Sequence, residues 1–157
     1  IGAGLYRLVC SNGLTIPTSL AQQFTIRHKN VNMDDVRRIT DDLAKQLPII
    51  SNSVKSFENR EMKSSEAQEF MTKAMMLRWE KGSIPKMDIN KMLEPKREGD
   101  VGNSLWKVFN VAQEKLTRGG EQYQTQRGRL SMVRELKNFD RVNSINTKLW
   151  EMAESYI

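Results

Sequence analysis

The residue types that carry catalysis or bind metals are sparse in this chain. His28 and Cys10 are the only histidine and cysteine, and together they cannot supply the four ligands of a structural zinc site. The acidic pair Asp34 and Asp35 falls at the start of an expected helix, where it complements the positive end of the helix dipole. The sequence contains no phosphate-binding glycine loop, nucleophile-elbow serine or paired zinc-binding histidines. We therefore expect no catalytic activity, no metal and no cofactor.

The chemistry that the sequence favours is contact with phosphate. The formal net charge is +6, with 25 lysines and arginines against 19 acidic residues. A positive excess favours acidic partners such as nucleic acid. The excess lies in three blocks, residues 1–32, 60–97 and 118–141, separated by neutral or slightly acidic segments. A moderately basic, solvated surface is the alternative interpretation of the same excess.

Residues 115–141 are the most specific candidate for a nucleic-acid interface. They combine basic residues with glutamines, glycines and Tyr123. A flexible stretch of this composition can follow a phosphate backbone, and an exposed aromatic ring can stack on a base. An ordinary exposed connection between helices is the alternative. The phosphate contacts that we predict for the whole chain are Arg27, Lys29, Arg118, Arg127, Arg129 and Arg134.

Residues 1–31 are expected to form a small β element. Residues 5–10 are β-prone, and Asn12-Gly13 is a strong hairpin signal because both residue types tolerate positive φ. Residues 14–16 would return as the partner strand until Pro17, which lacks an N–H donor, ends the pairing. The sequence therefore predicts an N-terminal hairpin or small sheet.

From residue 32 onward the apolar residues recur at spacings of three and four, which predicts about five helices. The first begins near Asn32, and Pro48 should kink or break it. Ser65 with Gln68 forms a capping-box pattern for the second helix. Residues 82–103 are expected to be a long connection, with at most a short helix near 88–93.

The second half of the helical region follows the same logic. Ser104 is expected to cap a third long helix, and Gly119 should end it. A short helix is expected over 130–139, and a last one from Asn143 or Ser144. The fold class that we predict is α+β, mainly helical, in a single domain. Core or interface packing is the expected role of the three tryptophans, Trp79, Trp106 and Trp150, and the nine methionines suit an adaptable core or an oligomer contact.

The ends and the hydropathy of the chain suggest its setting. The chain opens at Ile1 without a methionine, so we interpret residues 1–157 as the C-terminal part of a larger protein. No window approaches the roughly 20 apolar residues that a membrane-spanning helix needs. One cysteine excludes an internal disulfide. We expect no membrane partner and a location in the cytoplasm of a bacterial host cell.

Two stretches together carry a resemblance to a known family. Residues 7–14, RLVCSNGL, followed by residues 26–29, IRHK, resemble the signature RxVCxNxL … (I/V)xHxx of a phage/plasmid-like domain-of-unknown-function family. Residues 105–114, LWKVFNVAQE, with 118–120 and 148–150, are similar to that family's C-terminal region. The resemblance spans nearly the whole chain, as the family's second half. It implies a mobile-element setting, often replication, recombination or host interaction, without an established activity.

The polar residues inside the matched motifs are Asn12, His28, Asn110, Gln113 and Glu114. Asn12 suits the turn itself, and His28 suits an exposed position or a phosphate contact. The other three fall on one helix face at spacings of three and four. A buried polar network and a binding site are equally compatible with that face.

Our leading hypothesis is a non-enzymatic nucleic-acid-binding protein of a phage or plasmid that acts on single-stranded DNA in replication or recombination. The main alternative is a structural or protein-interaction component, such as an oligomeric assembly protein or a binder of a host factor. A homo-oligomer is compatible with both hypotheses.

Overall fold

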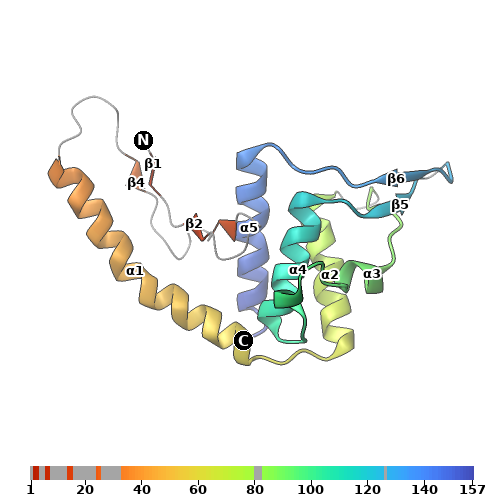
Figure 1. Cartoon of the computed structure of the whole chain (residues 1–157), viewed down its shortest axis with the longest axis horizontal. Helices are drawn as coiled ribbons and strands as arrows, with labels where there is room; N and C mark the ends of the chain where they lie inside the picture. The colour runs from red at the N-terminus through yellow and green to blue at the C-terminus, as the bar shows by residue number, and fades with distance from the viewer. Residues whose placement is uncertain are drawn as a thin grey trace.

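The computed structural model describes residues 2–3, 6–7, 14–15, 24–25, 33–79, 83–125 and 127–157. The described chain is mostly helical (Figure 1), which confirms the predicted helical character. The helices in chain order are α1 (Met33–Asn59), α2 (Ser64–Arg78), α3 (Ile89–Leu93), the 3-10 helix η1 (Glu98–Asp100), α4 (Leu105–Arg118) and α5 (Phe139–Glu154).

Helix α4 forms the centre of the core and packs against α1, α2, α3 and α5. Its two ends are set by local signals, as predicted. The Ser104 hydroxyl accepts a hydrogen bond from the backbone N–H of Lys107 at 3.4 Å, and Gly119 follows the last turn with a φ of 68°. Along the helix, the predicted apolar stripe is buried: Leu105, Val108, Phe109, Ala112 and Leu116.

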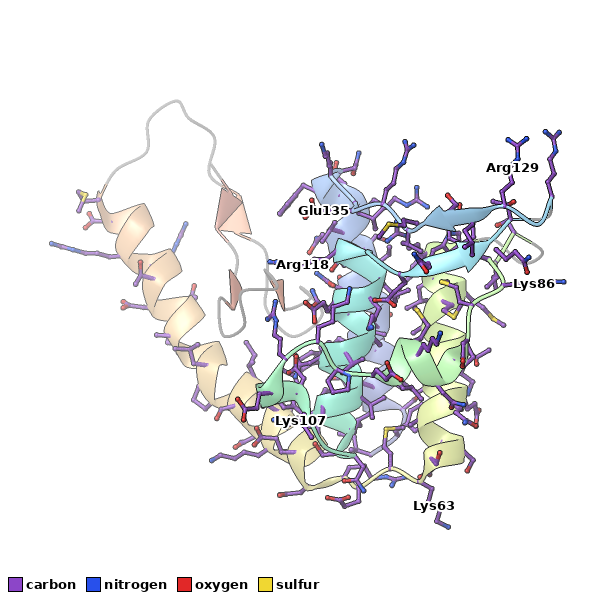
Figure 2. The ribbon with its side chains drawn as sticks, turned by 45° about the vertical axis from the view of Figure 1, so that its right-hand side comes forward. Lys63, Lys86, Lys107, Arg118, Arg129 and Glu135 are labelled. Atoms are coloured by element: carbon purple, nitrogen blue, oxygen red, sulfur yellow. The ribbon has the colours of Figure 1, made fainter. Side chains whose placement is uncertain are left out.

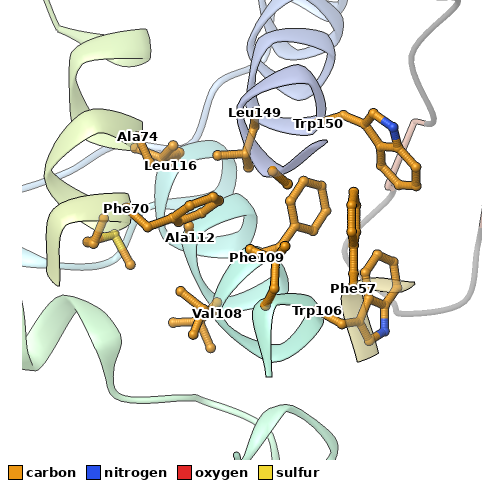
Figure 3. Close-up of a cluster of buried hydrophobic side chains, with 14 of the residues drawn as sticks. Phe57, Phe70, Ala74, Trp106, Val108, Phe109, Ala112, Leu116, Leu149 and Trp150 are labelled. Atoms are coloured by element: carbon orange, nitrogen blue, oxygen red, sulfur yellow. The ribbon is translucent and has the colours of Figure 1, made fainter. Parts of the chain in front are cut away.

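An aromatic cluster joins three helices at the core (Figure 3). Phe57 of α1 lies 4.9 Å from Trp150 of α5, ring centre to ring centre. Trp106 stacks on Phe109 of the same helix at 5.6 Å, and Trp150 meets Phe109 edge to face at 5.8 Å. Trp150 is fully buried, and its indole N–H donates to the Glu154 carboxylate at 2.8 Å. The core role predicted for Trp106 and Trp150 is confirmed.

Helix α1 runs unbroken through Pro48 and extends away from the other helices (Figure 1). A proline removes one backbone hydrogen bond to the carbonyl four residues earlier. Here both Pro48 and Ala44 are exposed, so water can bind the carbonyl that loses its donor. Among the side chains of this helix that the structure describes, those that reach the core lie in its C-terminal part: Ile50, Val54 and Phe57.

The connection between α2 and α4 contains the predicted short helix. Asp88 caps α3, because its carboxylate accepts a hydrogen bond from the backbone N–H of Asn90 at 2.9 Å. Helix α2 begins one residue before the predicted cap. The residue paired across its first turn is Glu66 rather than Gln68, since Glu66 accepts from the backbone N–H of Lys63 at 2.8 Å.

The N-terminal strands that the structure describes are two residues long. β1 (Gly2–Ala3) pairs with β4 (Phe24–Thr25), and β2 (Tyr6–Arg7) pairs with β3 (Leu14–Thr15), both antiparallel. The predicted turn at Asn12-Gly13 lies outside the described residues. Strand pairs this short cannot make a stable sheet by themselves, and the predicted N-terminal hairpin is not supported.

A hairpin with three-residue strands lies late in the chain, where the prediction was wrong. β5 (Gln122–Gln124) pairs antiparallel with β6 (Leu130–Met132), and Tyr123 lies opposite Ser131. Residues 130–132 are therefore a strand rather than the start of a helix, and α5 begins at Phe139, capped by Asn138. The reason is non-local. The Val133 carbonyl accepts from Gly120 N–H, and Val133 N–H donates to the Glu121 carbonyl, each at 2.8 Å.

Candidate nucleic-acid interface

The β5–β6 hairpin projects from the C-terminal end of α4, beyond the helical body (Figure 1). Its turn is closed by local bonds: Gly128, with a φ of 75°, donates its N–H to the Thr125 carbonyl at 2.9 Å. The backbone N–H of Arg129 also donates to the Thr125 hydroxyl at 3.1 Å. Arg127 lies within this turn and Arg129 follows it, so both are held at the tip of the hairpin.

A glycine fixes the hairpin against the end of α4. A Cβ atom added to Gly119 would lie 2.4 Å from the Val133 carbonyl oxygen, so only glycine permits this approach. The backbone N–H of Leu136 donates to the Thr117 carbonyl at 2.8 Å, which ties the segment after β6 to the same helix. The hairpin base and the last turn of α4 therefore form one hydrogen-bonded unit.

Ion pairs reinforce that base. The Glu121 carboxylate lies 2.8 Å from the ammonium groups of both Lys96 and Lys115. Lys115 is 3% exposed, so its charge depends on this partner. Burial alone would raise the pKa of Glu121, but hydrogen bonds from Lys115 and Lys96 outweigh it and hold that pKa below its ordinary value.

Arg78 connects the helical body to the segment that follows β6. Its guanidinium donates to the carbonyl oxygens of Leu116 and Arg134, and its own carbonyl accepts from the Arg141 guanidinium at 2.9 Å. The side chain also lies over the ring of Trp79, 5.0 Å from the ring centre. Burial, together with the positive charge of Arg141, lowers the pKa of Arg78 from its ordinary value.

An open hollow of about 950 Å³, which we call the first hollow, lies beside the hairpin. The backbone of Lys86 pairs with Gln124, so the segment before α3 forms one wall and the hairpin the other. Three cationic side chains and no carboxylate occur among the described residues that line the first hollow. The lining comprises Trp79 and residues 83–86, 123–125 and 127–129.

A second hollow of about 270 Å³ adjoins it. Its described lining is again free of carboxylates and includes Arg134 together with the buried Arg78. Trp79 and Tyr123 line both hollows, so the two rings lie at their common boundary. The remaining lining residues of the second hollow are 131–133.

The structure brings together some of the predicted phosphate contacts. Arg127 and Arg129 share the first hollow, and Arg134 lines the second. Arg118 is exposed at the end of α4 but lies well away from the hairpin tip that carries Arg129 (Figure 2). In the described part of the chain, none of these four guanidinium groups forms an ion pair. Arg27, Lys29 and His28 lie outside the described residues.

Two residues of this site were not predicted from the sequence. The backbone of Lys86 pairs with Gln124, 38 positions later in the chain, and no local sequence pattern predicts such a pairing. Core or interface packing was predicted for Trp79, without a role at this site. Trp79 is half-buried at the C-terminal cap of α2, where it packs against the core and also lines both hollows.

The polar motif residues of α4 lie in the helical body instead. Asn110, Gln113 and Glu114 are all buried. The Asn110 amide donates to the Trp106 carbonyl of its own helix at 2.9 Å, and Glu114 lies 3.3 Å from the Arg97 guanidinium. The Gln113 amide has no hydrogen-bond partner among the described residues. None of the three lines the first or the second hollow.

Metal binding and membrane insertion are two further possibilities that the described residues address. Within the described ranges, no cluster of three or more His, Cys, Asp or Glu side chains is arranged to hold a metal ion. No helix found there combines the length and apolar character needed to cross a membrane.

Comparisons with known proteins give relatives but no activity. The UPF0380 protein YafZ of Escherichia coli K12 is 29% identical over 160 residues, and the UPF0380 protein YfjQ of the same strain is 25% identical over 157 residues. Each alignment covers 98% of this chain and 56% of the relative, so the chain spans little more than half the length of either. No solved structure matches the chain.

The family match covers almost the whole chain. Residues 1–150, including all of both motif stretches, match the model of a domain of unknown function, DUF932. The predicted membership of a family of unknown function is confirmed, whereas the phage or plasmid setting and the second-half assignment stay predictions. The chain belongs to the DUF932 family.

Proposed function

We propose that this chain is a non-catalytic nucleic-acid-binding protein that holds single-stranded DNA through the β5–β6 hairpin. The observation that carries the proposal is the first hollow, whose described lining includes Lys86, Arg127 and Arg129 and no carboxylate. A phage or plasmid setting, action in replication or recombination, and a cytoplasmic location in the bacterial host belong to the same proposal. The chain spans 56% of the length of these relatives, so any activity of the whole protein also belongs to this proposal.

The physical support is electrostatic. Cations that lack carboxylate partners keep their full charge for a ligand, and phosphates neutralised by them release condensed counterions. The hollow is open and about 950 Å³, which suits an extended chain crossing it better than a single enclosed small molecule. The hairpin extends beyond the helical body (Figure 1), and Arg129 lies at its tip (Figure 2), where a strand can reach it.

Fluorescence anisotropy with a labelled oligothymidylate tests this proposal. We expect binding at low salt that weakens as salt rises, with the logarithmic slope falling by about 0.7 for each phosphate contact removed. Arg129→Glu should weaken binding at least tenfold and reduce that slope. Lys55→Glu is the matched control, because Lys55 is exposed on α1, away from the hairpin (Figure 1).

Two results would overturn the proposal. One is the absence of binding at low salt by the folded chain. The other is an equal loss of affinity in the Arg129→Glu and Lys55→Glu variants, since a general charge effect needs no site at the hairpin.

The alternative function, a structural or protein-interaction component, is favoured by a different observation. Helix α1 extends from the body and exposes Met33, Leu47 and Ile49, the last two at 52% each. Light scattering separates the two functions. A defined oligomer that ignores oligonucleotides favours the alternative, and a monomer that binds them excludes it.

A further inference from the structure

We infer that Trp79 and Tyr123 form a stacking platform for unpaired bases, which makes them the residues that select single strands over duplexes. The inference rests on the proposed function. The cations of the hollows recognise a phosphate backbone of either kind, so they cannot make that selection. A separate feature of the site must do so.

The two rings differ from the large aromatic rings at the centre of the core. Phe57, Trp106, Phe109 and Trp150 are buried and contact one another in the core. Trp79 and Tyr123 are only half-buried, and neither has an aromatic ring partner within the described residues. Both residues line the hollows instead.

The Arg78 side chain lies over the Trp79 ring and holds it in place. The Arg78 guanidinium lies 5.0 Å from its ring centre, and that guanidinium is itself fixed by the carbonyls of Leu116 and Arg134. One side of the indole is thus occupied by a buried cation. A ring fixed in this way loses little conformational entropy when a base stacks on its open side.

The order of charges and rings suits a single strand. Lys86, Arg127 and Arg129 line the first hollow, Arg134 lines the second, and the two rings lie at the boundary between them. A strand crossing that boundary would place phosphates near cations on both sides and a base against the rings. A duplex keeps its bases stacked inside the helix, so it presents no free base face to this platform.

The intrinsic fluorescence of the protein offers a direct test. Trp106 is 5% exposed and Trp150 is fully buried, so Trp79 is the tryptophan that a bound base can reach. We expect oligothymidylate to quench part of the emission of the full chain, and a duplex of equal length to leave it unchanged. Trp79→Phe should remove this quenching while keeping most of the affinity, because a phenyl ring still stacks.

Affinity measurements complete the test. Trp79→Leu and Tyr123→Leu should each weaken single-strand binding about tenfold, the loss of one base stack, with an unchanged salt slope and unchanged duplex affinity. Arg129→Glu should weaken both ligands and lower the slope. Equal melting temperatures verify folding. If Trp79→Leu is unfolded, Trp79→Phe and Tyr123→Leu provide the comparison.

The outcomes separate this inference from the proposed function. Binding of single strands and duplexes with equal affinity, unaffected by Trp79→Leu or Tyr123→Leu, overturns the stacking platform and leaves the phosphate site in place. Binding of neither ligand at low salt overturns both.

Discussion

At the residue scale, Glu121 contributes to stability because its carboxylate is the counter-charge of the buried Lys115. Its pKa is lowered in the folded protein, so it contributes stability above its ordinary pKa of 4.5 that is lost as pH falls through the folded pKa. Glu121→Gln should destabilise the protein by about 3 kcal/mol at pH 7, since it leaves Lys115 buried without a counter-charge. Urea unfolding between pH 7 and pH 3 measures both effects, and the variant should lose less stability on acidification.

The control for this prediction is Lys115→Met combined with Glu121→Gln. Removing both charges should cost less than removing Glu121 alone, because no unpaired charge remains in the interior. A single variant as stable as the unaltered protein at pH 7 would mean that Lys115 does not rely on Glu121.

Residue composition predicted part of the candidate site. Arg127 and Arg129 were identified because basic residues, glutamines and glycines gather around them. Lys86 and Trp79 were not, because their roles come from backbone pairing with Gln124 and from the fixed position of Arg78. Such contacts join residues far apart in sequence, and neither leaves a periodic or compositional signal.

At the element scale, the same contrast separates α4 from the hairpin. Helix α4 was predictable because its cap, its apolar stripe and its final glycine are all local signals. The hairpin was not, since its strands are three residues long and Leu130, Val133 and Leu136 also fit a helical stripe. Pairing of Val133 with Gly120 and Glu121 decides in favour of the strand.

That pairing depends on Gly119, which gives a prediction for the whole element. Gly119→Ala should cost about 3 kcal/mol, because a φ of 68° strains any side chain and the added Cβ would displace Val133. Amide hydrogen exchange should rise at Gly120 and Val133. Gly99→Ala is the control: nothing lies within 4 Å of its added Cβ, so its stability should change by less than about 0.5 kcal/mol. Equal effects of the two substitutions would contradict the close approach.

At the scale of the whole molecule, α4 connects the aromatic cluster that holds α1 to the base of the β5–β6 hairpin. The aromatic cluster that anchors α1 lies at the first turns of α4, through Trp106 and Phe109. The hairpin base lies at the C-terminal end of α4, through Gly119. The 14 residues of the helix separate these attachments by about 20 Å at 1.5 Å per residue. Loss of the α1 anchor should therefore weaken the fold without altering the hairpin site.

Phe57→Ala tests this separation. The side chain is fully buried against Trp106, Phe109 and Trp150, so its removal should lower the free energy of unfolding by about 4 kcal/mol. Oligothymidylate affinity, measured where the variant is still folded, should stay within about twofold of the unaltered protein, because the hydrogen bonds and ion pairs of the hairpin base do not involve α1. Leu47→Ala, on the exposed part of the same helix, should change neither quantity. A tenfold loss of affinity in folded Phe57→Ala would instead show that α1 and the hairpin act as one surface, coupled through α4.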